Sequence, residues 1–487
     1  MLVKRSIGVA IVFFWCLMNV LLLKRQLWAP PPAISLRSSE RISYAIEEWW
    51  GVFYRGEKIG YASQTIEPRG KGYKLNSFSV LRLNLLGTTQ SVTTRLESEA
   101  NEEWILETFS FDLASNEVSF KARGVVAPGK LHLEIESAGH RSKTALALKH
   151  APHLLATLKP YAATQQLEPG KPHFFSTFDP ATLSQQITTV TIEGREHLRI
   201  GSRAEPAIRL RQQFKGISVI SWIDGSGRTL REESPAGLSL LRQSPEEAKD
   251  FAKSRAVPLD LITQSSIEPD RPISNAALRQ FLKLKLSGFD LTSFPLQSGR
   301  QKLIGDQLEI HRERIESIPS VSTPVRDAGV RSYLQATPFV QSDHPRIRTL
   351  TREIVGAEKD PHKVVVRLKD WVHREIAKEP TVSLPNALEV LQIRKGDCNE
   401  HTVLFNALAR AAGIPAKTAV GVAYLRGAFY YHAWSEVWLG SWISLDSVLN
   451  QFPADVTHVK FLEGEIDRQI DILQLIGKLK IQVIEAM

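Results

Sequence analysis

The sequence predicts an α+β protein, and three observations carry this prediction. Between residues 47 and 254 apolar and polar side chains alternate with a period of two, which is typical of strands that bury one face. From about Ser332 apolar residues recur every three or four positions, which indicates helices, and further strands follow. Ahead of both regions, residues 7–23 form an almost wholly apolar run. A chain of 487 residues has room for about three domains.

The apolar run at residues 7–23 predicts a membrane anchor. Lys4 and Arg5 precede it, and no small-residue cleavage site follows it. Its length is at the short end for a membrane-spanning helix. We expect an uncleaved signal-anchor helix over 1–28 and a Pro/Ser-rich linker over 29–46, with the bulk of the chain outside the cytoplasm, in the periplasm or at the cell surface. A buried helix of a soluble protein is disfavoured because the run has no polar face.

The region 47–254 is predicted to be a large antiparallel β domain. Residues 218–233 are expected to form a hairpin, with two strands joined by a glycine-containing turn. One helix is expected near 144–158. No catalytic constellation stands out in this region. Three segments show the alternation most clearly: FSFDL (109–113), VSFKAR (118–123) and LHLEIE (131–136).

Two further segments complete the predicted organisation. Residues 255–330 are punctuated by prolines and are expected to form a small β connector. Residues 331–487 are expected to form a C-terminal domain in which helices precede strands. One of its helices should begin at Cys398 and end at Gly413, because glycine followed by proline, here Pro415, is a helix stop.

The charge of the chain argues against one class of partner. The net charge is +9, but 61 Lys and Arg are spread thinly among 52 Asp and Glu, without a run of five or six like charges. We therefore expect a solvated basic surface rather than a nucleic-acid interface. A mild attraction to anionic membrane surfaces stays open.

Cys398 is the only cysteine after Cys16, so the chain beyond the apolar run cannot form an internal disulfide. Such a single thiol is either a reactive group or an inert buried side chain. Gly396 and Asp397 suggest a tight turn and an N-cap, which puts Cys398 in the first turn of a helix. There the helix dipole and a nearby imidazolium can lower a thiol pKa from about 8.5 to ~3.5–7.5. The sequence thus favours a nucleophilic cysteine.

A base for this cysteine is expected at His432, with Asp446 as its partner. If Trp438–Gly440 is a three-residue hairpin loop, Val437 pairs with Ser441 and His432 faces Asp446 directly. Cross-strand neighbours have Cβ atoms about 4.5–5.5 Å apart, close enough for the carboxylate to orient the imidazole. A shift of one residue would place the two on opposite faces.

These residues lie in segments that resemble a known family. "RKGDCNEHTVLFNALARAAGIPAKTAVGV", "HAWSEVWL" and "WISLD" resemble the transglutaminase-like superfamily over roughly residues 333–460. The resemblance implies a papain-like α+β core in the domain 331–487, with Cys398 as nucleophile, His432 as base and Asp446 as orienting residue. Ser447 and the valine after it depart from the Pro and Thr that often follow the family's aspartate.

The resemblance also implies an activity. We expect a bacterial membrane-anchored enzyme that transfers acyl groups through a thioester, either a protease or amidase or a transglutaminase, acting on a protein or peptide substrate in the cell envelope. No cofactor and no metal are expected. The alternative is a non-catalytic envelope protein that uses the papain-like core as a scaffold and the β domain to bind a partner.

Other residues near the candidate site have competing interpretations. Cys398, His401 and His432 have poor spacing for zinc, so His401 is expected to support the site or lie on the helix surface. Gln392 is either an oxyanion donor or, more simply, a surface glutamine. Three tryptophans expected on the face of His432 either line a substrate groove or pack together: Trp434, Trp438 and Trp442.

Overall fold

The computed structural model describes residues 42–85, 88–115, 118–137, 139–164, 167–200, 203–250, 265–315, 324–325, 327–381 and 383–487. The predicted α+β class is wrong for the chain as a whole. Strands hold 48% of it and helices 21%, so the protein is mostly β. The helical pattern was read correctly after Ser332, but it is outweighed by the length of the strands that precede it.

The membrane prediction must also be corrected. Over the described ranges, no helix is long and apolar enough to cross a membrane. The expected anchor at 1–28 and most of the linker 29–46 lie outside the described residues. The extracytoplasmic location depended on that anchor and loses its support with it.

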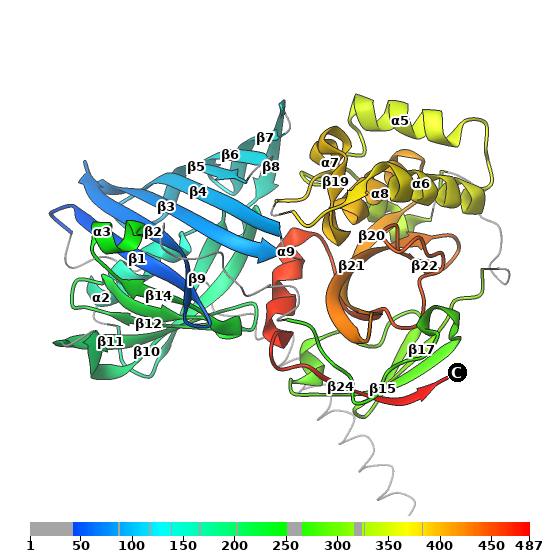
Figure 1. The fold of residues 1–487 in the computed structure, drawn as a ribbon. Coiled ribbons are helices and arrows are strands. Elements are labelled where there is room, and N and C mark those ends of the chain that lie inside the picture. The colour runs from blue at the N-terminus through cyan, green and yellow to red at the C-terminus, as the bar shows by residue number, and fades with distance from the viewer. Residues whose placement is uncertain are drawn as a thin grey trace, which may run out of the picture.

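A single large antiparallel sheet contains fourteen strands in the order β8-β7-β6-β5-β4-β3-β2-β1-β14-β13-β12-β11-β10-β9. Strands β1 to β8 and strands β9 to β14 each follow one another in chain order, β1 joins the two halves by pairing with β14, and β8 and β9 form the two edges. Figure 1 shows the sheet curling around its own interior. The strands are β1 (Ile46–Tyr54), β2 (Glu57–Arg69), β3 (Gly72–Leu85), β4 (Thr88–Ala100), β5 (Leu106–Ala114), β6 (Ser119–Ala127), β7 (Lys130–Ser137), β8 (His140–Ala147), β9 (Pro172–Asp179), β10 (Ser184–Ile200), β11 (Arg203–Phe214), β12 (Ile217–Ile223), β13 (Thr229–Glu233) and β14 (Leu238–Arg242).

The period-two pattern explains this sheet, because alternate side chains form its core. The hairpin predicted at 218–233 is present as β12 and β13. The helix expected near 144–158 is not: β8 occupies the first residues and pairs with β7 along its whole length. Pairing at the sheet edge satisfies the backbone there, and α2 (Leu158–Thr164) begins only where that expected helix ends.

A smaller sheet joins the middle of the chain to its C-terminus. Its order is β16-β17-β15-β24, and it uses β15 (Phe281–Ser287), β16 (Gln301–Ile304), β17 (Gln307–His311) and the last strand, β24 (Lys480–Ala486). Strand β24 pairs antiparallel with β15. The predicted segments 255–330 and 331–487 therefore share a sheet, and the boundary between them stays a prediction.

The C-terminal helices pack on a third sheet, of order β22-β21-β20-β23. Apolar side chains from both sides meet in a common core that includes Leu404 and Leu408 of one helix and Val437 of the sheet. The strands are β20 (Ala416–Leu425), β21 (Ala428–Trp438), β22 (Trp442–Leu445) and β23 (Val459–Glu463). The helices are α5 (Pro345–Val355), α6 (Pro361–Glu375), α7 (Ala387–Ile393) and α8 (Cys398–Ala411).

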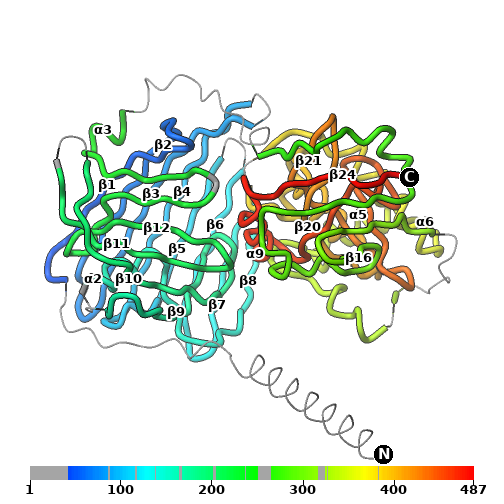
Figure 2. Tube along the Cα trace, turned by 90° about the horizontal axis from the view of Figure 1, so that it is seen from below, coloured from blue at the N-terminus to red at the C-terminus, as the bar shows by residue number. Residues whose placement is uncertain are grey.

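The large sheet and the C-terminal part contact each other. The ring of Phe120 on β6 stacks on Phe339 at 6.3 Å between centroids, and the Ser137 hydroxyl donates to the buried Glu389 carboxylate. Helix α9 (Ile466–Gln469) lies at this junction in both ribbon and tube views (Figures 1 and 2).

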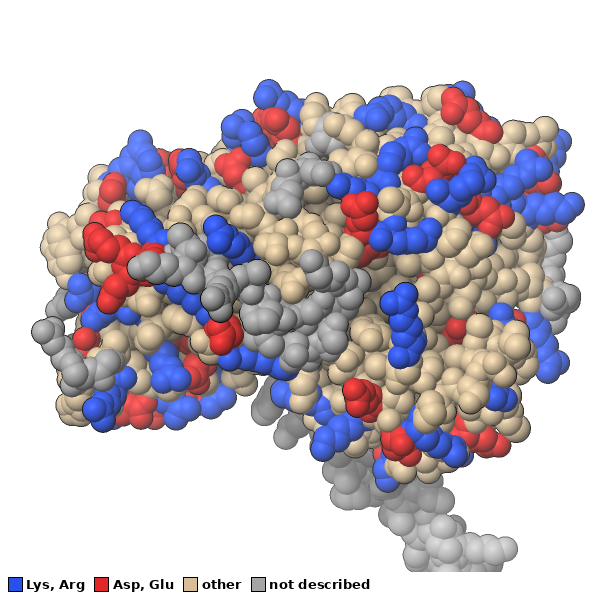
Figure 3. All heavy atoms as spheres, in the orientation of Figure 1, with Lys and Arg blue, Asp and Glu red and all other residues tan. Residues whose placement is uncertain are grey.

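On the face drawn in Figure 3, basic and acidic residues are interspersed, which fits the solvated surface expected from the sequence. The absence of a nucleic-acid partner stays a prediction.

Candidate active site

Helix α8 begins at Cys398, as the sequence predicted. The Asp397 side chain is the N-cap: it accepts from the Asn399 N–H, and the Glu400 carboxyl group accepts the backbone N–H of Asp397 at 2.9 Å in return. This reciprocal capping box fixes the first turn. Gly396 is needed for packing, because a Cβ there would lie 2.2 Å from Cβ of Glu400.

The thiol of Cys398 is held between this helix start and strand β21. The backbone N–H of Ala433 hydrogen-bonds to it, so the thiol lies beside the residue that follows His432. Burial raises the pKa of the thiol well above its usual value, and the Asp397 carboxylate beside it adds to the rise. The sequence analysis predicted a lowered thiol pKa, because the positive end of the helix dipole favours the thiolate. The effect of the dipole is outweighed by burial and, next, by the capping group, which is itself an acid in contact with the thiol.

His432 and Asp446 meet, although through a different register from the predicted one. Nε2 of His432 lies 2.7 Å from Oδ2 of Asp446. Val437 pairs with Ile443, not with Ser441, and the loop comprises the three residues after Trp438. The predicted pairing was therefore wrong by two positions. A two-residue shift leaves every side chain on the same face, so the diagonal contact still forms.

The Asp446 carboxylate is buried, with 1% exposure, and accepts four hydrogen bonds. Oδ1 accepts from the backbone N–H groups of Val448 and Leu449. Oδ2 accepts from His432 and from a second imidazole, that of His458, at 3.0 Å. Although burial alone would raise the pKa of Asp446, the two histidines hold it well below its usual range. Asp446 is thus an ionised carboxylate with a fixed orientation.

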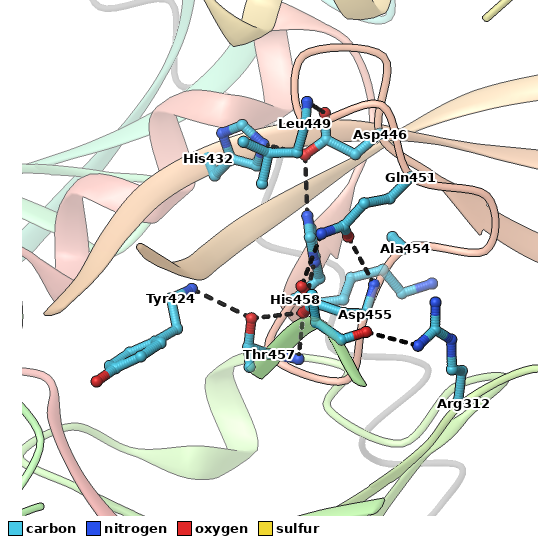
Figure 4. A network of polar contacts seen from close by, with 12 residues as sticks. Arg312, Tyr424, His432, Asp446, Leu449, Gln451, Ala454, Asp455, Thr457 and His458 are labelled. Atoms are coloured by element: carbon cyan, nitrogen blue, oxygen red, sulfur yellow. Dashed lines mark hydrogen bonds and ion pairs between the residues drawn. The ribbon is translucent and has the colours of Figure 1, made fainter. Parts of the chain in front are cut away.

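His458 was missed by the sequence analysis. It is fully buried between two carboxylates: its Nε2 faces Asp446, and its Nδ1 lies 3.3 Å from Oδ1 of Asp455 (Figure 4). These partners raise the pKa of His458 to about 9 in spite of its burial. The sequence signal was an acid three residues before a histidine, just ahead of β23, but nothing local connects this pair with Asp446.

The histidine cluster does not have the arrangement of a metal site. The ring nitrogens of His432 and His458 and a carboxylate oxygen of Asp446 lie within 4.8 Å of one another. Both nitrogens, however, are at hydrogen-bond distance from the same oxygen, so each is a donor rather than a ligand. His401 is buried rather than on the helix surface, and both of its nitrogens face backbone carbonyls, those of Asp397 and Ile376.

The remaining candidates have simpler roles. Gln392 is exposed on α7, as expected for a surface glutamine. Trp434 is 1% exposed and packs against both site histidines, with ring centroids 6.3 Å from His432 and 5.1 Å from His458. Trp438 and Trp442 pack on each other at the far end of the hairpin. The tryptophans therefore pack, and Trp434 covers the imidazoles.

Comparisons with known proteins agree with part of this description. An uncharacterized protein of Haemophilus influenzae is 31% identical over 109 residues, which cover 20% of this chain and 29% of that protein, so the chain matches less than a third of that relative's length. A candidate cysteine protease from Cytophaga hutchinsonii is 16% identical with a TM-score of 0.31, over 42% of this chain and 83% of the other. A β-barrel-like protein of unknown function from Brucella abortus is 11% identical with a TM-score of 0.33, over 42% of this chain and 95% of the other.

Structural likenesses at these TM-scores carry no functional argument. The family comparison is more specific, because residues 348–447 match the transglutaminase-like superfamily. The matched segment contains Cys398, His432 and Asp446, of which the last two are in contact, while the thiol of Cys398 lies at the backbone of Ala433. The chain therefore carries a transglutaminase-like domain, the one that the sequence resemblance predicted.

Proposed function

We propose that this protein is a cysteine-dependent acyl-transfer enzyme that acts on peptide or carboxamide bonds. The observation that carries the proposal is the arrangement at β21. The Cys398 thiol lies at Ala433, and the neighbouring His432 has Nε2 bound to Asp446. The other ring nitrogen, Nδ1, is then the one available to accept a proton from the thiol.

The proposed reaction follows from this geometry. As Sγ of Cys398 attacks the carbonyl carbon, its proton passes to Nδ1 of His432, and the carbonyl becomes an oxyanion. The backbone N–H of Cys398, at the helix start, is placed to stabilise that charge. The amine then leaves with the proton from His432, and a thioester remains on Cys398. Water completes hydrolysis, whereas a lysine-type amine would complete a cross-link.

The direction of the thiol pKa favours one form of this mechanism. Because burial and Asp397 oppose ionisation, the resting thiol is protonated and must lose its proton during attack. His432 therefore acts as a general base in the same step, rather than as the partner of a preformed thiolate. Asp446, ionised at neutral pH, stabilises the imidazolium that forms.

A second function draws support from the same burial. If the thiol is inert, the transglutaminase-like domain is a non-catalytic scaffold, and the large sheet would bind a partner. Labelling with an electrophilic peptide probe distinguishes the two. We expect covalent modification at Cys398 that is abolished in Cys398→Ser and strongly slowed in His432→Ala. A folded protein that labels no faster at Cys398 than a denatured control, and equally in His432→Ala, would establish the scaffold.

A further inference from the structure

His458 is a buried titratable group that lies next to the site and that the proposed mechanism leaves unused. Its side chain is fully buried, and both ring nitrogens face carboxylates. The carboxylate oxygens can only accept, so both nitrogens must carry protons for both contacts to be hydrogen bonds. An imidazole with two N–H groups is an imidazolium. Because both partners are carboxylates, which compensate a positive charge, the geometry points to His458 as a buried cation.

The surroundings of His458 support this charge state. The groups that face it are the carboxylates of Asp446 and Asp455, the imidazole of His432 and, through backbone contacts, a guanidinium. That guanidinium, of Arg300, donates to the carbonyl of His458 at 3.1 Å and pairs with Glu313 at 3.0 Å. Asp455 is itself fixed by Thr457 and by the carboxamide of Gln451 (Figure 4). The cation thus lies in a prearranged polar network.

The cation shares its main partner with the proposed catalytic base. Nε2 of His432 lies 2.7 Å and Nε2 of His458 lies 3.0 Å from the same oxygen of Asp446. The two rings are 5.7 Å apart between centroids. When His432 takes a proton, a second positive charge appears beside the first, and the attraction of Asp446 is divided between them.

We propose that His458 is a positioning residue that fixes the Asp446 carboxylate and, as a permanent cation, limits how readily His432 holds a proton in the resting site. This inference rests on the proposed function. It explains why a site with an ionised aspartate need not contain a preformed thiolate–imidazolium pair: His458 neutralises part of the aspartate's charge. Proton uptake by His432 is then reserved for the moment at which Cys398 attacks.

The test is the titration of His432 in the full chain with His458→Gln. Glutamine can still donate one hydrogen bond to Asp446 but carries no charge. With histidines labelled by ¹³C at Cε1, NMR should show the His432 midpoint rise by about one pH unit. Because neutral His432 is the base that takes the thiol proton, the pH profile of Cys398 alkylation should shift up by a similar amount, and the rate below the wild-type midpoint should fall about threefold to tenfold.

Asp455→Asn is the second variant, because it weakens the cation without touching Asp446. It should shift the His432 midpoint in the same direction and by less. A folded His458→Gln protein with an unchanged His432 midpoint and an unchanged alkylation profile would overturn the proposal, even if its Tm falls. If His458→Gln does not fold, an unchanged midpoint in Asp455→Asn overturns it. Failure of the proposed function appears separately, as wild-type labelling that does not depend on His432.

Discussion

Acids lie on both sides of the candidate active site, and the pKa of Asp397 on one side moves in the opposite direction from those of Asp446 and Asp455 on the other. At the start of α8, Asp397 lies beside Glu400, and its pKa is raised well above the usual value by burial and by that second acid. At the far side of His432, Asp446 and Asp455 are also buried, but their pKa values are lowered. Burial is common to all three acids, so it cannot explain the difference.

The groups that contact each acid explain why the pKa shifts differ in direction. Asp446 and Asp455 face imidazoles, and His458 lies between them as a cation, whereas Asp397 faces another carboxyl group and a thiol. A buried acid ionises more readily when a positive charge compensates it and less readily when its neighbour is another acid. The surroundings of Asp446 therefore stabilise a negative charge, and those of Asp397 destabilise one.

The largest expected effect is the loss of the ionised acid beside His432. Asp446→Asn should slow labelling of Cys398 by at least about 100-fold, because the imidazolium formed during attack loses its counter-charge. It should also lower Tm, since Asp446 accepts four hydrogen bonds in the core. The measurement is the labelling rate of folded protein, checked by circular dichroism.

Asp455→Asn is the matched control for that loss. It breaks a similar buried contact with His458 but does not touch His432. We expect a comparable fall in Tm with labelling within about fivefold of the wild-type rate. If the two variants slow labelling equally, Asp446 acts only through stability, and its orienting role is refuted.

The next effect concerns the stability that the buried cation supplies. The folded-state pKa of His458 is raised from 6.5 to about 9, so its contribution is present below pH 6.5 and is lost as pH rises through 9. A shift of this size corresponds to about 3 kcal/mol. The free energy of unfolding, measured in urea at pH 6.5 and pH 9, should fall over this window in the wild type. A His458→Gln protein with the same fall would place the pH dependence elsewhere.

The acid beside the thiol should have a smaller and opposite effect on reactivity. Asp397→Asn keeps an N-capping side chain and removes the charge that opposes the thiolate. We expect the rate of Cys398 alkylation at pH 7 to rise about threefold to tenfold. Glu400→Gln is the comparison, because this acid contributes less to the thiol pKa, and its effect should be smaller. An unchanged rate in Asp397→Asn would mean that Asp397 is neutral and that burial alone raises the thiol pKa.

The smallest effect is expected at the contact between the large sheet and α7. Burial raises the pKa of Glu389 to about 7, so this residue makes folding less favourable as pH rises from 4.5 through 7. Glu389→Gln should raise the free energy of unfolding at pH 8 by at most about 3 kcal/mol, the equivalent of the whole shift, and change it little at pH 4.5. A gain of equal size at both pH values would show that the charge of Glu389 is not responsible.

The sequence predicted the local features of the site better than the architecture. The start of α8 followed from Gly396 and Asp397, which act within one turn, and its end, at Ala411, lies two residues before the stop predicted from Gly413. The class of the whole chain was wrong, because a class depends on how much chain each type of element occupies. The expected helix near 144–158 failed for a related reason: pairing with β7 is a long-range gain that local propensity does not contain.

What the sequence determined by itself was the position of Cys398 at the start of α8 and the face that His432 and Asp446 share, because side-chain direction in a strand depends only on whether positions differ by an even number. The register of β21 and β22, the direction of the thiol pKa and the presence of His458 were decided by the tertiary structure. Each depends on groups that burial and packing bring together from separate elements. The interaction between two charged groups depends on the distance between them and on their exposure to solvent, and both are set only when the chain folds.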